Sequence, residues 1–505
     1  MPSGITPESP VQSDPSAAGS AASERRSLDR SLLSGIAWTG TVKWGTQVIS
    51  WATTLLVARL LSPADYGIVG MATVVLGVVQ LINEFGIGAA IVQRRDMSES
   101  TIARVGGFAV ALGFVFFAVS LILAPLLAAF FGEPAVAPVV AVLGINFITS
   151  SVRTIPFALL MRDLKFRMLA GIEMVEALCL AAGTLAFALA GFGYWSLVLG
   201  SVAAKAIGSA VAAAKSPHRI AWPVPFGEIS SAVRFGADVV VARLAWYAYS
   251  NADYAVVGRL LGKTALGHYS FGWTLASIPV DKIYGLYQRV SGAIFARVQH
   301  DKEALARYLI GITEGVALVS LPMSVGLALV ADQVVPLVLG ERWLGAIGPL
   351  RFLALASIVR SLDPLLAQLL ISTGHSRQNA RTMGAAALLM PVMFIAGSRW
   401  GATGVAAAWL IGHPLIVMPQ QLRHVLPVAG TTLGRYLLAL WPAASGCLVM
   451  TAAVMATRAL ADTRLPAPAA LAAAIIAGAV SYAAVILLVH RQRVQRLRDI
   501  IRNRG

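Results

Sequence analysis

Charged side chains stand inside long apolar stretches of this 505-residue chain. A charged side chain near the centre of a membrane-spanning helix costs at least about 2.5–3.5 kcal/mol, so it usually faces a protein interior or a water-filled cavity. Six of the most central charges are cationic, namely Lys43, Arg153, Lys205, Arg243, Lys282 and Arg360. Four acidic residues within these stretches are candidates for a functional role, namely Glu84, Asp253, Asp281 and Asp363. This pattern indicates a polar interior inside an apolar protein.

The excess of cations indicates which chemistry such an interior could do. Guanidinium and ammonium groups bind phosphate and diphosphate, and guanidinium does so with two parallel hydrogen bonds. We therefore predict that the six cations bind an anionic substrate, with Arg153, Arg243 and Lys282 as first choices. The four acidic residues would orient these cations or couple transport to protons or sodium. The alternative is that the charges pair internally and hold helices together, as Arg360 and Asp363 could do on one helix.

The elements that must position these charges are membrane-spanning helices. The chain is 57% hydrophobic and 13% charged, with a mean hydropathy of +0.74, whereas a soluble protein carries about 25% charged residues. The apolar runs predict an all-α polytopic membrane protein with about fourteen spans, arranged as two six-helix lobes plus two C-terminal helices. The expected spans are roughly 33–60, 67–93, 104–131, 136–161, 168–191, 193–214, 231–261, 265–293, 308–331, 344–373, 379–398, 402–421, 436–457 and 468–490.

The basic residues predict the orientation of the chain in the membrane. The net charge of +16 is spread between the apolar runs and forms no single patch, which argues against nucleic acid as a partner. About 24 Lys and Arg residues, among them Arg307, Arg381 and Arg435, fall on one side of the predicted membrane. About 7, among them Arg59, Arg259 and Lys263, fall on the other side. Since cytoplasmic loops carry the excess of Lys and Arg, we expect both termini to be cytoplasmic.

A weak internal repeat appears at an offset of about 200 residues. The sequence VARLL at 57–61 corresponds to VGRLL at 257–261, and Gly67 corresponds to Gly267. Six predicted spans separate the two copies, so the halves would share one orientation, a symmetry that transporters use. Chance similarity between helix ends is the alternative. A looser match pairs Arg153 and Pro156 with Arg360 and Pro364.

The repeat and the loop lengths predict the organisation of the chain. We expect a disordered cytoplasmic tail at 1–30, an N-terminal transmembrane lobe at 31–215, a C-terminal lobe at 230–425, two additional helices at 436–490 and a basic cytoplasmic tail at 491–505. Cys179 and Cys447 both lie in apolar runs and indicate neither a disulfide framework nor a metal site. The sequence has no Walker loop, HExxH or GxSxG motif, so we expect neither a cofactor nor enzymatic activity.

Four stretches carry a resemblance to a known family: ARLLSPADYGIVG at 58–70, FGIGAAIVQRRD at 85–96, PFALLMRDLKFR at 156–167 and NADYAVVGRLLG at 251–262. They resemble the bacterial polysaccharide exporters, the O-antigen and exopolysaccharide flippases of the multidrug/oligosaccharidyl-lipid/polysaccharide exporter superfamily. The resemblance extends over roughly residues 30–430 and separates this branch from the drug antiporters better than it identifies a glycan.

The resemblance implies two facing lobes around a central cavity and alternating access in the bacterial inner membrane. The implied substrate is a polyprenyl-diphosphate-linked oligosaccharide, with membrane lipids and a glycan polymerase or export machinery as further partners. The family has no universally fixed catalytic residue, so none is transferred to this sequence. Two alternatives stay open: a cation-coupled drug antiporter of the same superfamily, and a membrane-embedded glycan polymerase or ligase. The latter would usually need a large external loop, and none is predicted here.

Overall fold

The computed structural model describes residues 45–83, 91, 97–216, 218–222, 226–491 and 493, apart from the side chains at 81–83, 226–245, 279, 281–282, 286 and 289. These residues form helices and connecting turns, with no strand among them, which confirms the predicted all-α class. Helix also covers residues 45–60. The α-helices that follow are α2 (Pro63–Asn83), α4 (Glu99–Phe131), α5 (Val136–Arg162), α6 (Phe166–Leu189), α7 (Trp195–Lys215), α8 (Phe226–Arg297), α9 (Lys302–Leu339), α10 (Ile347–Ser372), α11 (Ser376–Gly397), α12 (Gly401–Gly412), α13 (Met418–Ala429), α14 (Leu433–Ala461) and α15 (Ala467–Leu488).

Short polar and glycine signals set the helix boundaries. Ser98 caps α4, because its hydroxyl accepts a hydrogen bond from the Thr101 backbone N–H at 3.2 Å and so satisfies one free donor of the first turn. Gly132 ends the same helix in the left-handed conformation, with φ of 67°. Gly262, with φ of 83° and ψ of 178°, interrupts α8. This break lies where the sequence predicts the end of one span and the start of the next.

Ten helical stretches among the described residues are long and apolar enough to cross a membrane. The predicted count of fourteen is not confirmed. The stretch Ser376–Ala429, which contains α11 to α13, counts once where the sequence predicts two spans. Helix α8, where two further spans are predicted, is not among the ten, and charged residues recur along its length. The first predicted span begins outside the described residues.

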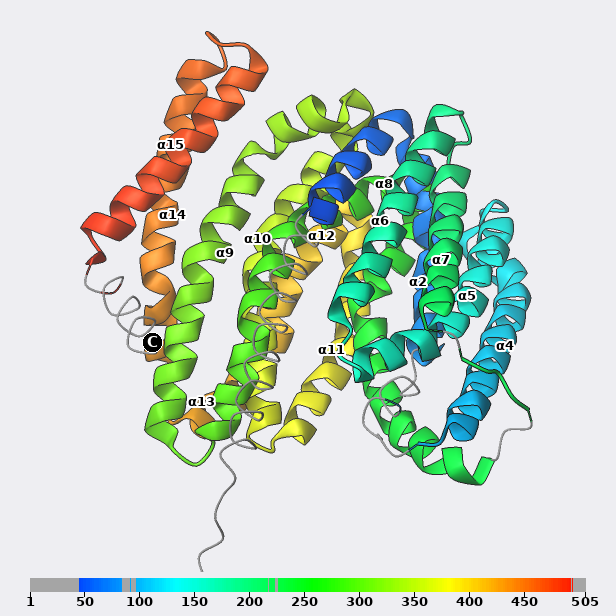
Figure 1. Cartoon of the computed structure of the whole chain (residues 1–505). Coiled ribbons are helices and arrows are strands. Elements are labelled where there is room, and N and C mark those ends of the chain that lie inside the picture. The colour runs from blue at the N-terminus through cyan, green and yellow to red at the C-terminus, as the bar shows by residue number, and fades with distance from the viewer. Residues whose placement is uncertain are drawn as a thin grey trace, which may run out of the picture.

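The helices of the two sequence halves lie side by side (Figure 1). Helices α2 and α4 to α7 gather on one side, and α9 to α13 gather on the other. The long α8 joins them, since it packs against α2 as well as against α10 and α11. Helices α14 and α15 pack on each other and on the outer face of α9. One apolar core draws buried residues from both halves, so the two halves are held together through α2 and α8.

The two halves meet at one end through a reciprocal pair of glycine contacts. A β-carbon at Gly67 would overlap the backbone carbonyl of Lys263, and a β-carbon at Gly267 would overlap the carbonyl of Pro63. An offset of 200 residues converts each contact into the other. Only glycine allows so close a backbone approach. The contact therefore has the reciprocal form expected of an approximate two-fold axis, as a parallel repeat predicts.

Arginines next to these glycines also cross between the halves. The Arg59 guanidinium donates hydrogen bonds to the carbonyls of Val338 at 2.7 Å and Leu337 at 2.5 Å, at the end of α9. Its repeat counterpart Arg259 reaches in the opposite direction and lies 5.7 Å from the centroid of the Phe130 ring, at the end of α4. Each half thus places an arginine on the corresponding helix end of the other half.

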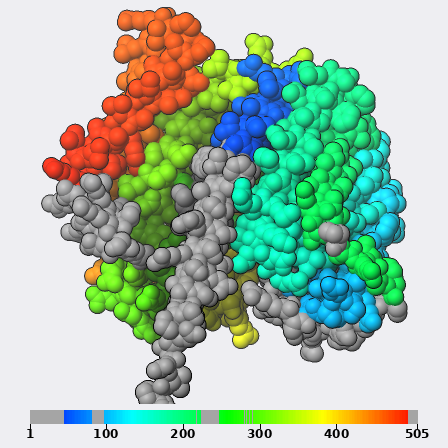
Figure 2. Space-filling view, in the orientation of Figure 1, coloured from blue at the N-terminus to red at the C-terminus, as the bar shows by residue number. Residues whose placement is uncertain are grey.

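An ion pair and an indole hydrogen bond also join the two halves at this end of the molecule, which we call the closed end. Lys263 Nζ lies 2.9 Å from Glu133 Oε2, and Trp343 Nε1 donates to the Ala58 carbonyl at 2.8 Å. Both interactions join the N-terminal half to the C-terminal half. Figure 2 shows the segment that begins at residue 45, in blue, lying between the two halves at this end. The two halves are therefore fastened here by polar as well as apolar contacts.

Candidate functional site

Five of the predicted site residues lie outside what the structure describes. Lys43 and Glu84 are outside the described residues, and the side chains of Arg243, Asp281 and Lys282 in α8 are outside the described side chains. Their assignments to substrate binding and coupling stay predictions. The remaining five are described and fall into two regions, one in each half of the chain.

In the N-terminal half, Arg153 of α5 forms an ion pair with Glu176 of α6. The side chains are 23% and 22% exposed, so the pair is partly accessible from outside the packed helices. The Arg153 guanidinium also lies 4.7 Å from the centroid of the Phe157 ring on the same helix. Lys205, predicted with Arg153 as a substrate-binding cation, is half-buried on α7.

Glu176 was not among the predicted site residues, although the sequence carries a signal for it. It stands near the middle of the apolar run 168–191, a depth at which a carboxylate requires a partner. The structure supplies that partner as Arg153. An acidic residue near mid-span indicates a buried or paired charge, but it does not identify the partner on another helix.

In the C-terminal half, Arg360 of α10 lies against two tryptophans from different helices. Its guanidinium carbon is 3.9 Å from the ring centroid of Trp273 in α8 and 5.8 Å from that of Trp409 in α12. A cation over an aromatic face gains about 0.5–2 kcal/mol, more when water is excluded. The two rings themselves lie 5.3 Å apart, so this arginine joins three helices.

Asp253 lies beneath the same tryptophans and is completely buried. Its Oδ2 accepts hydrogen bonds from the Tyr269 hydroxyl at 2.5 Å and from Trp409 Nε1 at 2.8 Å. Its Oδ1 accepts a third from the Tyr254 backbone N–H at 2.9 Å. A buried carboxylate needs such partners to offset its loss of hydration. Here they are neutral donors, so Asp253 is positioned without a directly bonded cation.

Asp363 lies one turn after Arg360 on α10 and faces a histidine. His413 Nε2 is 3.8 Å from Asp363 Oδ1, and the His413 side chain is only 2% exposed, against 18% for Asp363. The His413 ring also lies 6.3 Å from that of Trp409. The predicted residues Asp253, Arg360 and Asp363 are therefore brought into one polar cluster inside the C-terminal half.

This C-terminal cluster contains groups that the sequence did not single out. Trp409 and His413 stand four residues apart, a spacing that places both on one helix face. His413 opens a π-helical segment, His413–Val417, that separates α12 from α13, and such segments are frequent at functional sites. A histidine within the apolar run 402–421 was the available signal. Its proximity to Asp363 depends on tertiary packing that periodicity does not reveal.

The cluster holds one guanidinium, two carboxylates and an imidazole between α8, α10, α12 and the π-helical segment. In the described part of the chain, no three His, Cys, Asp or Glu side chains gather closely enough to hold a metal ion.

Comparison with known proteins places these features in a family. Residues 56–348, more than half of the chain, match the family described as polysaccharide biosynthesis protein. Three curated relatives are similar over most of their length. The lipopolysaccharide biosynthesis protein WzxC of Escherichia coli K12 is 24% identical over 82% of this chain and 85% of its own. The teichuronic acid biosynthesis protein TuaB of Bacillus subtilis 168 is 25% identical over 69% of this chain and 73% of its own. The succinoglycan biosynthesis transport protein ExoT of Rhizobium meliloti 1021 is 24% identical over 65% of this chain and 66% of its own.

Two solved structures share the fold. The lipid II flippase MurJ in an inward closed conformation superposes with a TM-score of 0.74 at 13% identity, over 90% of this chain and 99% of that one. An inward-facing multidrug resistance transporter of the MATE family gives a TM-score of 0.60 at 14% identity, over 76% and 95% of the two chains. Together with the ten apolar helices, the relatives identify a multi-pass membrane protein.

Proposed function

The chain belongs to the polysaccharide biosynthesis protein family, and on this premise we propose that it is a flippase for lipid-linked glycan precursors. The proposed substrate is a polyprenyl-diphosphate-linked oligosaccharide, moved from the cytoplasmic to the outer leaflet of the bacterial inner membrane. The family match is the observation that carries this proposal. The names of WzxC and ExoT, which refer to lipopolysaccharide biosynthesis and to succinoglycan transport, support it.

The reciprocal contacts suit an alternating-access mechanism. We propose that the lobes 31–215 and 230–425 rock against each other about the approximate two-fold axis marked by Gly67 and Gly267. The closed end would then be the outer one, because the sparse basic residues assigned to the outer side, including Arg59 and Arg259, lie there. This assignment places both termini in the cytoplasm. Opening would require the Arg59 and Lys263 contacts to break.

We propose that Arg153 contributes to diphosphate binding by partner exchange. The Arg153 and Glu176 side chains stay 23% and 22% exposed, so a phosphate could approach the guanidinium as the pair opens. Phosphate then offers the guanidinium a bidentate partner with more negative charge. Lys43, Lys205, Arg243 and Lys282 remain proposed substrate-binding cations on the strength of their mid-span positions.

We propose that the C-terminal cluster couples the conformational cycle to a proton or small cation. Asp363 is the stronger candidate for the titrating group, because its side chain is 18% exposed and its neighbour His413 can share a proton. Asp253 is fully buried and satisfied by three donors, so it would position Tyr269 and Trp409 around Arg360. Glu84 and Asp281 stay proposed partners for cations from their sequence positions alone.

Transport of the lipid-linked precursor can be measured directly with the purified chain in proteoliposomes. We expect a fluorescent polyprenyl-diphosphate oligosaccharide to become accessible to a membrane-impermeant enzyme or quencher on the far leaflet. Efflux of cationic dyes under the same gradients would instead favour the drug antiporter that shares this fold. Chain extension of the glycan by the purified protein would favour a polymerase or ligase. Failure to move the precursor, with correct insertion shown by protease protection, would overturn the flippase proposal.

A further inference from the structure

At the closed end, each half of the chain sets one aromatic side chain against the other half. Trp343 belongs to the short 3₁₀ helix Glu341–Ala346, which lies between α9 and α10 and begins after Gly340. Phe131 is the last residue of α4, at the connection to α5. Trp343 is completely buried and Phe131 is 5% exposed. Both side chains are therefore enclosed, although they stand where one helix connects to the next.

The indole of Trp343 caps the end of a helix in the N-terminal half. Its Nε1 donates to the carbonyl of Ala58, a completely buried residue, at 2.8 Å. This carbonyl belongs to the last turn of the helix over residues 45–60, where carbonyls lack partners within the helix. The backbone N–H of Ser62, four residues further on, donates instead to Asp65 Oδ2 at 2.8 Å. Trp343 thus supplies a donor that this buried helix end needs, and supplies it from the opposite half.

The Trp343 ring also completes a group of three aromatic rings. Its centroid lies 5.4 Å from that of Tyr66 in α2, at an interplanar angle of 76°, and 4.7 Å from that of Phe271 in α8. The rings of Tyr66 and Phe271 are themselves 5.6 Å apart, edge to face. Aromatic pairs prefer such edge-to-face arrangements. Since Tyr66 comes from the N-terminal half and Phe271 from the C-terminal half, the indole lies across the boundary between the halves.

Phe131 makes the corresponding contact in the opposite direction. A β-carbon at Gly258 of α8 would lie 2.8 Å from Phe131 Cε1, closer than packed side chains allow. Gly258 corresponds to Ala58 at the offset of 200 residues that relates VARLL to VGRLL. Glycine at this position leaves the space that the phenyl ring occupies. The two aromatic side chains therefore contact equivalent positions of the opposite halves.

We propose that Trp343 and Phe131 are paired latches that hold the outer side of the protein closed, with Trp343 as the stronger one. Both rings must leave Ala58 and Gly258 before the halves separate at this end, so they set how often the outer side opens. Withdrawal of Trp343 breaks a hydrogen bond as well as the ring contact with Tyr66, whereas withdrawal of Phe131 breaks a packing contact. This inference rests on the proposed alternating movement of the two halves.

Distances between spin labels on the full chain in detergent test the latches, because they report the two ends of the molecule separately. One pair of labels is attached at Phe192→Cys and Trp400→Cys, exposed residues of the two halves on the predicted outer side. The other pair is attached at Met168→Cys and Arg381→Cys, exposed residues of the two halves on the basic side. Both pairs are made in a chain whose two native cysteines are replaced by serine and alanine.

Loss of the stronger latch should open the outer end and close the inner one. Trp343→Ala should lengthen the outer distance, shorten the inner distance, and raise the ratio of outer-open to outer-closed molecules about tenfold or more. Trp343→Phe keeps a ring but removes the N–H group, and should raise this ratio about threefold to tenfold. Gly258→Ala displaces the Phe131 ring and should raise the ratio about threefold. Adding Phe131→Leu to Gly258→Ala makes room for the new methyl group and should restore most of the outer-closed population.

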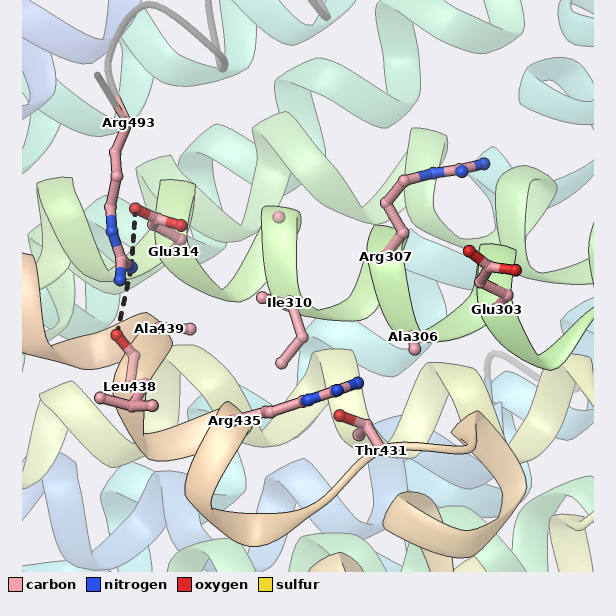
Figure 3. Close-up of a pocket in the computed structure, with 11 residues that line it drawn as sticks. Glu303, Ala306, Arg307, Ile310, Glu314, Thr431, Arg435, Leu438, Ala439 and Arg493 are labelled. Carbon is pink, nitrogen blue, oxygen red and sulfur yellow. Dashed lines mark hydrogen bonds and ion pairs between the residues drawn. The ribbon is translucent and has the colours of Figure 1, made fainter. Parts of the chain in front are cut away.

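Two control variants remove contacts that do not cross between the halves. Phe295→Ala removes a completely buried ring whose apolar cluster contains only residues of α8 to α14. Arg493→Gln removes the hydrogen bond to the Leu438 carbonyl at 3.2 Å, at the wall of a cavity between α9 and α14 (Figure 3). Phe295→Ala should lower the unfolding temperature, and neither variant should shift the outer or the inner distance.

Three results would overturn the proposal. Lower unfolding temperatures in the Trp343 variants with both distances unchanged would show that the indole only packs. Longer distances at both ends would show a loosened fold instead of an opened latch. Failure of Phe131→Leu to restore the Gly258→Ala chain would remove Phe131 from the pair. If Trp343→Ala does not fold, Trp343→Phe decides the role of the indole.

The distances are measured without substrate, so they do not depend on what the protein transports. Reciprocal changes of the two distances in a chain that moves no lipid-linked precursor would support the latches and overturn the flippase proposal. Transport of the precursor by the wild-type chain, with no change of distance in any Trp343 variant, would do the reverse.

Discussion

Arg153 and Arg360 occupy related positions in the two halves of the chain, but their surroundings differ. Arg153 stands three residues before Pro156 in α5, and Arg360 stands four before Pro364 in α10. The first is partly exposed and paired with a carboxylate of the next helix. Arg360 lies against the Trp273 ring. Two carboxyl groups belong to the same cluster: Asp253 accepts a hydrogen bond from Trp409, and Asp363 faces His413. The two halves thus use one kind of cation in two environments.

This difference suggests different roles for the two arginines. Arg153 would exchange its carboxylate partner for substrate, whereas Arg360 would hold the neighbouring helices in place. The Arg153 and Glu176 side chains are 23% and 22% exposed, and under the proposed mechanism Arg153 releases Glu176 and takes a phosphate. Arg360 lies against Trp273 and Trp409 and joins three helices, so its removal would abolish the cation–π contacts that connect them. We therefore expect substitutions in the C-terminal half to have the larger effects on stability as well as on transport.

Substitution of Arg360 should give the largest effect. Arg360→Ala removes two cation–π contacts, each of about 0.5–2 kcal/mol, and a cation one turn from Asp363 on α10. Arg360→Ala should therefore lower the unfolding temperature in detergent and reduce proteoliposome transport by about hundredfold or more. Arg360→Lys keeps the charge but not the flat stacking surface, and should retain part of both. Unchanged transport and stability in Arg360→Ala would remove the proposed difference between the halves.

The glycine contact tests whether the halves are related at their closed end. Gly67→Val and Gly267→Val each place a side chain where the backbone carbonyl of the other half lies, and overpacking of this kind costs about 1–3 kcal/mol. Because the contacts are reciprocal, both variants should reduce transport by a similar factor of about ten to a hundred.

The matched control for these variants is Gly171→Ala in α6. No atom outside its local helix lies within 4 Å of a β-carbon at Gly171, and alanine is favoured over glycine in helices by about 1 kcal/mol. This variant should transport normally and be no less stable. A strong effect at Gly67 with none at Gly267 would contradict the approximate two-fold relation.

Sequence patterns were sufficient for the class of fold, because the all-α class depends on local composition. Substrate binding by Arg153 and Arg360 and coupling or charge pairing by Asp363 stay predictions. The structure shows Arg153 paired with Glu176, Arg360 against two tryptophans and Asp363 facing His413. The partners Glu176 and His413 could not be derived, since hydropathy fixes the depth of a residue but not the rotation of its helix. The number of membrane spans could not be derived from composition either. Charged residues recur along α8, so this helix contains no stretch apolar enough to be counted as a span.

The pair in the N-terminal half should show a smaller and more selective effect. Arg153→Ala should raise the substrate concentration needed for half-maximal transport about fivefold to tenfold, because a diphosphate contact is lost. Glu176→Gln should lower this substrate concentration or leave it unchanged, since the Arg153 guanidinium no longer has a competing carboxylate partner. In a double-mutant cycle, the stability coupling of the two residues should stay below about 1 kcal/mol. A coupling several times larger, with substrate affinity unchanged, would make the pair structural.

The smallest effect is expected at the arginines that cross between the halves. Arg59→Gln removes the two hydrogen bonds to Leu337 and Val338, and a hydrogen bond from a charged donor contributes about 1.5–3 kcal/mol when buried but less at this exposed position. Arg259→Gln removes an exposed cation–π contact of about 0.5–1 kcal/mol. Hydrogen exchange at 57–61 and 337–340 should therefore rise several-fold in Arg59→Gln, and exchange at 130–133 should rise less in Arg259→Gln. If hydrogen exchange instead rose equally in both variants at all these segments, the closed end would open as one unit. The two halves would then contribute equally to its closure, although their cation sites differ.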